Sequence, residues 1–162
     1  MKNHYLNLIS TDKRVNIAAT NGTETLASAD DVFNYIDSNF KNWGCDKAEQ
    51  PTKEMDVEVY EQIEDADYQK IFGNFNQDLD SLFLTTAQIK SFVLNNAKDY
   101  VREAEEWTTF RFLFKVGNEF FVADTRVHSD GKRDVRVRRF SYDGVCHAEH
   151  HHRIVVPQRF TD

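Results

Sequence analysis

The sequence predicts an α+β fold whose C-terminal part is an antiparallel β-meander packed against two or three helices. Apolar residues recur at helical spacing between residues 85 and 101, whereas from residue 110 they alternate with polar residues as in a strand. Gly117-Asn118 and Ser129-Asp130-Gly131 are hairpin-turn signals separated by a segment of strand length. The chain also contains 13 Phe, and aromatic side chains favour strands and large buried contacts.

The size and composition indicate one folded domain over residues 1–162. A chain of 162 residues is near the usual length of a single domain. Its 40% hydrophobic and 29% charged residues are ordinary for a globular protein. The segment 44–53 is polar and lacks periodicity, so we expect a flexible stretch there.

The first 63 residues are predicted to contain short strands and one helix. Residues 5–9 and 15–18 are apolar runs of strand length around a polar turn, and residues 56–63 alternate as a half-exposed strand does. Between them, Ser28 or Asp30 can cap a helix with one apolar face. That face consists of Val32, Phe33, Ile36 and Phe40.

Two further helices are expected in the middle of the chain. The spacing of Tyr68, Ile71 and Phe72 predicts a short helix that ends near Gly73 or Asn74. A longer helix should begin at Thr85 or Thr86, where a Thr cap precedes Gln88 and an apolar stripe that starts at Ile89.

The predicted register of the first hairpin is supported by the residue pairs that it produces on both faces. A two-residue turn at Gly117-Asn118 places Phe114 opposite Phe121. The same register places Arg111 opposite Asp124 on the other face, which is a favourable cross-strand pair. Aromatic side chains therefore share one face of the predicted hairpin.

The second hairpin follows a three-residue loop in which Gly131 takes the left-handed conformation. This loop places Thr125 opposite Val135 and Arg126 opposite Asp134. Continued alternation would bring Arg139 onto the aromatic face, so we expect a β-bulge near Arg138-Arg139. The strands of the predicted meander are about 109–116, 119–127, 133–140 and 145–156.

The cysteines and the apolar runs indicate a cytoplasmic protein. Two cysteines, Cys45 and Cys146, are too few for a disulfide framework, and we expect reduced thiols. The N-terminus lacks the apolar run of a signal peptide, and no segment reaches the ~20 apolar residues of a membrane span. We therefore expect no membrane partner.

The charge is divided unevenly along the chain. Residues 1–125 carry 12 Lys and Arg against 22 Asp and Glu, a net charge of −10. Residues 126–162 carry 8 Lys and Arg against 5 Asp and Glu, a net charge of +3, so the whole chain has −7. Nucleic-acid binding requires a basic footprint, so the acidic total makes nucleic acid an unfavoured partner.

The most unusual motif is the histidine-rich segment 146–153. Imidazole and carboxylate side chains are ligand types for zinc, nickel or copper. On a strand, however, alternate side chains lie about 6–7 Å apart, too far for three of them to hold one ion unaided. We expect no cofactor, with adventitious Zn or Ni binding as the alternative. The candidate metal ligands are His147, Glu149, His150, His151 and His152.

A group of arginines is the candidate binding surface for an anion or an acidic partner. Its members are Arg136, Arg138, Arg139 and Arg153. Arginines on an exposed sheet face also cover apolar surface with their stems and pair with nearby acidic residues.

Several segments of the chain resemble a family of small bacterial proteins of unknown function. The resemblance covers most of the chain and implies a bacterial, intracellular protein, without any assigned activity. The segments are 36–44 (IDSNFKNWG), 79–82 (LDSL), 112–116 (FLFKV), 119–123 (EFFVA), 137–140 (VRRF) and 155–158 (VVPQ).

These observations favour a non-enzymatic binding or interaction module for an unknown protein or a small acidic ligand. One alternative is a metal-dependent hydrolytic enzyme that uses the segment His147–His152. The other is a nucleic-acid accessory factor that acts through the strand Arg136–Arg139. The sequence leaves the catalytic residues unknown and the oligomeric state open, a homo-oligomer included.

Overall fold

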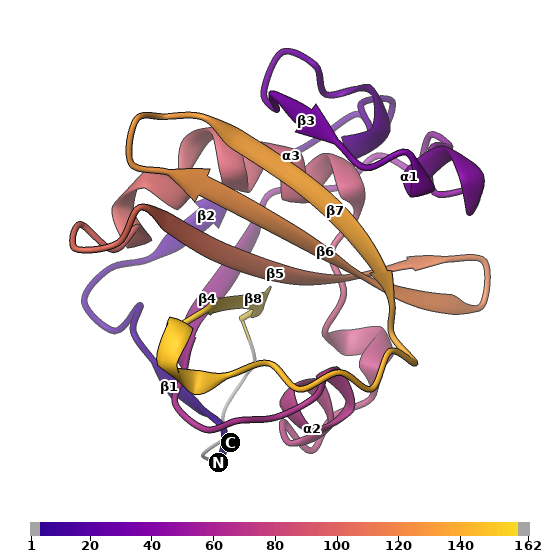
Figure 1. Cartoon of the computed structure of the whole chain (residues 1–162). Coiled ribbons are helices and arrows are strands. Elements are labelled where there is room, and N and C mark those ends of the chain that lie inside the picture. The colour runs from indigo at the N-terminus through magenta and orange to yellow at the C-terminus, as the bar shows by residue number, and fades with distance from the viewer. Residues whose placement is uncertain (1–3, 159–162) are drawn as a thin grey trace.

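The computed structural model describes residues 4–158 and confirms the α+β class. Its central feature is an eight-stranded, mostly antiparallel sheet with the order β1-β4-β8-β5-β6-β7-β3, in which β2 pairs with β4 (Figure 1). The strands are β1 (Leu6–Leu8), β2 (Val15–Ile17), β3 (Tyr35–Ile36), β4 (Met55–Gln62), β5 (Trp107–Val116), β6 (Glu119–His128), β7 (Arg133–Arg139) and β8 (Arg153–Pro157). The α-helices are α1 (Asn39–Asn42), α2 (Tyr68–Gly73) and α3 (Thr86–Asn95).

Both predicted hairpins form with the expected registers. In the β5–β6 pair, Phe114 faces Phe121 and Arg111 faces Asp124, while in the β6–β7 pair Arg126 faces Asp134. Gly117 has a φ of 60° and Gly131 a φ of 95°, values in the left-handed region that favours glycine at these turns. The meander is therefore confirmed as far as the end of β7.

The β-bulge expected near Arg138-Arg139 is wrong. The β6–β7 pairing continues without interruption to Phe121 opposite Arg139. Arg139 does lie on the aromatic face, where its guanidinium stacks over the Trp43 ring at 4.6 Å and pairs with Glu119 at 2.5 Å. A guanidinium can cover an aromatic ring and still reach a carboxylate at the sheet edge, so no extra residue is needed there.

The last strand is shorter than predicted and lies elsewhere in the sheet. It begins at Arg153 instead of residue 145, and it runs antiparallel to β4 and parallel to β5. The residues before it cross the other face of the meander, past α2 (Figure 1). Cys146 and Ala66 exchange two backbone hydrogen bonds, which fix this segment as a loop. The loop contains a 3-10 turn at Ala148–His150, after which His151 adopts a left-handed φ of 48°.

The predicted helix through Val32 and Phe40 is also wrong. This segment contains the short strand β3 and the single-turn helix α1. The backbone amides of Asn34 and Asp37 donate to the carbonyls of Arg133 and Val135, so the free edge of β7 takes the hydrogen bonds that a helix would have made internally. Val32, Phe33 and Phe40 are buried as expected, although a turn, the short strand β3 and a single helical turn replace the predicted helix.

The other two helices are confirmed, with the predicted cap at the start of α3, although α3 ends at Asn95 and the helical spacing extends to residue 101. Asp67 accepts a hydrogen bond from the Lys70 amide at the start of α2. At the start of α3, Thr85 and Gln88 form a reciprocal capping box. Two more 3-10 turns flank α3, at Leu79–Ser81 and Ala97–Tyr100, and another lies at Leu26–Ser28.

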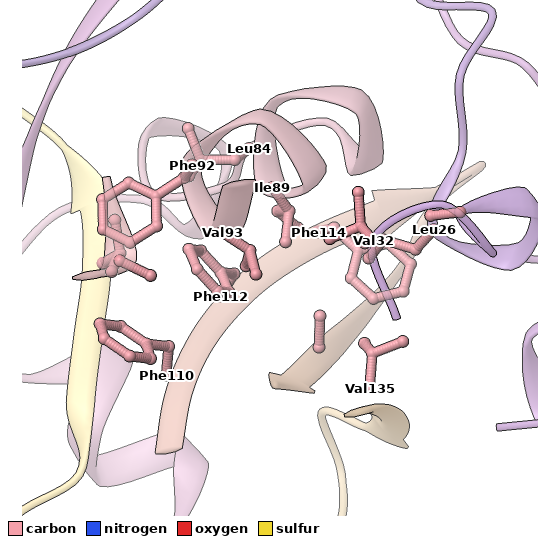
Figure 2. Packing of buried hydrophobic residues seen from close by; sticks show 14 of the residues in the cluster. Leu26, Val32, Leu84, Ile89, Phe92, Val93, Phe110, Phe112, Phe114 and Val135 are labelled. Carbon is pink, nitrogen blue, oxygen red and sulfur yellow. The ribbon is translucent and has the colours of Figure 1, made fainter. Parts of the chain in front are cut away.

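Both faces of the sheet carry buried apolar residues. On the first face, Phe110, Phe112 and Phe114 pack against α3, and Figure 2 shows their rings together with Phe92 and Val93. On the second face, Leu113 and Val122 pack with α2. Because α2 has only six residues, it covers one end of the second face and leaves polar positions along the rest of it.

No helix among residues 4–158 combines the length and the apolar character that a membrane crossing requires.

Candidate functional site

The candidate site is a small polar pocket on the second face of the meander. Its volume is about 170 Å³. The walls come from β5, β6, β7, the start of α2 and the loop between β7 and β8. The lining residues are Tyr68, Arg111, Asp124, Arg138, Tyr142, Gly144, Val145, Cys146, His147, His150 and His152.

Strand alternation explains how the charged walls come together. Arg111 lies between Phe110 and Phe112, so its side chain points away from the aromatic core toward the second face. The register places Asp124 directly opposite Arg111, and Arg138 two residues along β7 from the partner of Asp124. Three neighbouring strands thus supply two guanidinium groups and one carboxylate to the same hollow.

The loop that closes the pocket is held by hydrogen bonds to residues 62–66. Besides the backbone pair with Ala66, the Cys146 carbonyl accepts from Gln62 Nε2 at 2.5 Å. The Ala148 amide donates to Asp65 Oδ1 at 2.7 Å. These bonds hold the loop over the sheet, opposite Arg111.

Arg111 is the central residue of the pocket. Its side chain is only 9% exposed, and its Nη2 lies 3.7 Å from Asp124 Oδ2. Its Nη1 donates to Nδ1 of His152. Arg111 Nε and Asp124 Oδ1 are buried and have no hydrogen-bond partner among the described residues. A guanidinium has five N–H donors, so this buried cation uses only part of its capacity.

The surroundings of each pocket residue determine whether it is charged or neutral. Burial is the largest single influence on Arg111 and opposes its charge, but Asp124, Cys146 and Tyr68 together outweigh burial and raise the pKa of the guanidinium. Burial and the adjacent Arg111 lower the pKa of His152 to about 3. His152 is therefore neutral at physiological pH, so its Nδ1 can accept a hydrogen bond from Arg111.

Tyr68 and Cys146 are neutral walls of the pocket as well. Burial raises the pKa of the Tyr68 hydroxyl and the pKa of the Cys146 thiol. A buried thiol with a raised pKa is a poor nucleophile, because the thiolate is the reactive form. The two arginines and the single aspartate leave an excess positive charge, which suits a small anionic group such as a carboxylate or phosphate.

The histidine-rich segment does not converge on one point. His147 faces Asp65 at 3.5 Å and His151 faces Glu61 at 3.0 Å, whereas Glu149 pairs with His150 at 3.8 Å. The turn at Ala148–His150 sends these side chains in different directions. Within residues 4–158, no group of three or more His, Cys, Asp or Glu side chains is placed to hold a metal ion. His150 and His152 do stack on each other beside the pocket.

The four candidate arginines are divided between three places. Arg138 lines the pocket, with its guanidinium 4.8 Å from the centre of the Tyr142 ring. Arg136 shares that face but stacks over Tyr35 at 5.3 Å. Arg139 lies on the opposite face. Arg153 is buried and donates to the Tyr100 carbonyl at 2.9 Å and to Glu61.

Sequence reasoning missed Arg111, Asp124 and Tyr68 as site residues. The available signal was the predicted Arg111–Asp124 pair on the non-aromatic face, which we interpreted only as a favourable cross-strand pair. The crossing of the β7–β8 loop over that pair buries it, and this loop was expected to be a strand.

A larger hollow elsewhere lacks these features. It has a volume of about 590 Å³ and lies beside the loop that follows α2. All of its lining residues are exposed, so it contains no buried polar group that a ligand could satisfy. They are Gly73, Asn76, Gln77, Asp78 and Ser81.

The sequence matches no protein-family model, and neither the comparison with curated proteins nor the comparison with solved structures returned a match.

Proposed function

We propose that this protein is a non-enzymatic binding module that holds an anionic group of its ligand in the pocket around Arg111. The observation that carries this proposal is the buried guanidinium, whose Nε has no partner within residues 4–158 although it borders a hollow. A buried polar group without a hydrogen-bond partner destabilises the folded state by roughly 1–3 kcal/mol, and by more if the group is charged. A ligand oxygen that accepts from Arg111 would recover part of that loss.

The protonation states support binding over catalysis. Cys146, Tyr68 and His152 all favour their neutral forms near neutral pH, so the pocket lacks an activated nucleophile. His152 is also committed as an acceptor to Arg111, which opposes a role as a general base.

The size and charge of the pocket support a small acidic group over nucleic acid. A hollow of about 170 Å³ admits a terminal carboxylate or phosphate, not a polymer backbone. The chain as a whole carries a formal charge of −7, which repels a polyanion.

Titration with acetate and with inorganic phosphate at constant ionic strength tests this proposal. Amide resonances can be followed by two-dimensional NMR of the full chain. We expect saturable shifts at the walls of the pocket, at least for one of the two anions. Because Arg138 is a pocket cation, Arg138→Gln should weaken binding about tenfold, the value of one charge-assisted hydrogen bond.

Arg139→Gln is the matched control, because it removes the next arginine of β7 from the opposite face. It should leave anion binding within about twofold of the wild-type value. The proposal fails if neither anion produces saturable shifts, or if Arg139→Gln weakens binding as much as Arg138→Gln does.

A further inference from the structure

A second hollow adjoins the pocket and shares two of its walls. Its volume is about 400 Å³, and the shared walls are His150 and His152. The two imidazole rings stack with their centres 5.5 Å apart and their planes at 13°. The other lining residues are Glu105, Glu106, Trp107, Thr109 and Arg126.

The second hollow has the opposite charge character to the pocket. Its only cation, Arg126, is already held by both oxygens of Asp134, at 3.0 and 2.7 Å. Of its two carboxylates, Glu105 pairs with Arg102 at 3.0 Å. The partner of Glu106 is His128, at 3.0 Å, and this contact raises the pKa of the imidazole, so only a titratable group, and no permanently charged cation, compensates this carboxylate. Glu106 is also 75% exposed and thus available to a ligand.

The spacing along β5 relates the two hollows. Arg111, Thr109 and Trp107 are alternate residues of one strand and project to the same face. Alternate residues of a strand are about 6–7 Å apart, so Thr109 and Trp107, which line the second hollow, lie roughly 7–13 Å along the strand from Arg111. A ligand that spans them needs an extended chain of that length between its two ends.

We propose that the ligand is a small zwitterion, with a carboxylate beside Arg111 and an ammonium group beside Glu106. This inference rests on the proposed function, because the anionic end occupies the same pocket. The middle of the ligand passes the faces of His150 and His152, which present carbon-rich rings. Linear ω-amino acids have this chemistry: one carboxylate, one ammonium group and an apolar chain.

The acidic second hollow argues against a ligand with several negative charges. A second phosphate or carboxylate would lie against Glu105 and Glu106, where like charges repel. The carboxylates of the second hollow therefore favour a ligand that carries a cation at the end opposite its carboxylate.

Three matched probes test the inference: 8-aminooctanoate, octanoate and octylamine. Trp107 borders the second hollow, whereas Trp43, the other tryptophan, lies on the opposite face. A Trp43→Phe background therefore makes tryptophan fluorescence a reporter of this hollow. We expect 8-aminooctanoate to bind about fivefold more tightly than octanoate, the value of one partly exposed ion pair. Octylamine should bind more weakly than either.

Glu106→Gln separates the two charged ends. It should abolish the fivefold advantage of 8-aminooctanoate and leave the affinity for octanoate unchanged. Glu119→Gln removes a carboxylate at the far end of the meander and should preserve the advantage.

The possible results distinguish this inference from the proposed function. Equal affinities for 8-aminooctanoate and octanoate would overturn the zwitterion inference and leave the anion pocket in place. An advantage that survives Glu106→Gln would also overturn it. If neither carboxylate binds, in agreement with negative acetate and phosphate titrations, both proposals fail.

Discussion

The two faces of the β5–β6–β7 meander are made by alternate residues of the same strands, yet they have different roles. The first face is mostly apolar, with Thr125 within it and Arg139 at its edge, and it packs its phenylalanines against α3. The second face is apolar only beneath α2 and becomes polar at Arg111 and Asp124. The difference teaches that the first face supplies stability, whereas the second retains buried charges that a purely structural face would not need.

The first face should give the largest effect on stability. Phe112 is fully buried, and its ring meets that of Phe92 edge-on with the centres 5.4 Å apart. Phe112→Ala should lower the free energy of unfolding by about 3–5 kcal/mol, because it removes buried area and leaves a cavity. Urea denaturation followed by circular dichroism measures this loss. A change below about 1 kcal/mol would show that the first face is not the stabilising one.

The Arg111–Asp124 pair should behave differently, and it gives the next largest effect. Arg111→Met leaves the Asp124 carboxylate without its cation and should destabilise the fold by about 2–3 kcal/mol. The double variant Arg111→Met/Asp124→Leu should regain wild-type stability, because apolar residues often replace a buried ion pair without loss. Urea denaturation and the acetate titration together check this prediction.

The expected combination is restored stability with lost anion binding. A double variant that stays as unstable as the single one would mean that the pair is needed for the fold. The contrast between the two faces would then be incorrect.

The smallest effect concerns the pH dependence that the second face imposes. His152 has its pKa lowered to about 3 by burial and by Arg111, so the folded protein keeps this ring neutral. Its stabilising contribution is complete above the ordinary histidine pKa of about 6.5 and is lost as the pH falls toward 3, since only the unfolded chain takes up the proton in that window.

Comparison with His152→Gln isolates this contribution from those of other groups. Between about pH 7.5 and about pH 5, the wild-type protein should lose about 1–2 kcal/mol more unfolding free energy than the variant. Urea denaturation at the two pH values provides the measurement. Equal losses in the two proteins would place His152 in a solvated environment instead of the buried one that the second face provides.

Local patterns predicted the meander because its information is local. Turn glycines and alternation set the register from Phe110 to Val137, and this register is confirmed. Uninterrupted alternation would also have placed Arg138 and Arg139 on opposite faces, as observed, but we predicted a bulge there instead. The expected bulge was an error because we treated a positively charged residue on the aromatic face as forbidden, whereas Arg139 covers Trp43 at the edge of the sheet.

The failures occurred where backbone partners come from distant parts of the chain. The segment from Val32 to Phe40 has a helical apolar spacing, but its backbone amides donate hydrogen bonds to the open edge of β7. Residues 145–152 were predicted to begin the last strand, but their contacts with Ala66 and Asp65 make them a loop. Neither set of partners leaves a signal in the local sequence.

By itself, the sequence determined the class of the fold, the cap of α3, the two hairpin registers and the face of each side chain from Phe110 to Val137. Only the tertiary structure decided where β8 inserts, which arginines share a face with a hollow, and that Arg111 and Asp124 are buried together. The physical reason is that turn geometry and strand alternation act between neighbours along the chain. The burial of a charge depends instead on which remote segment crosses over it.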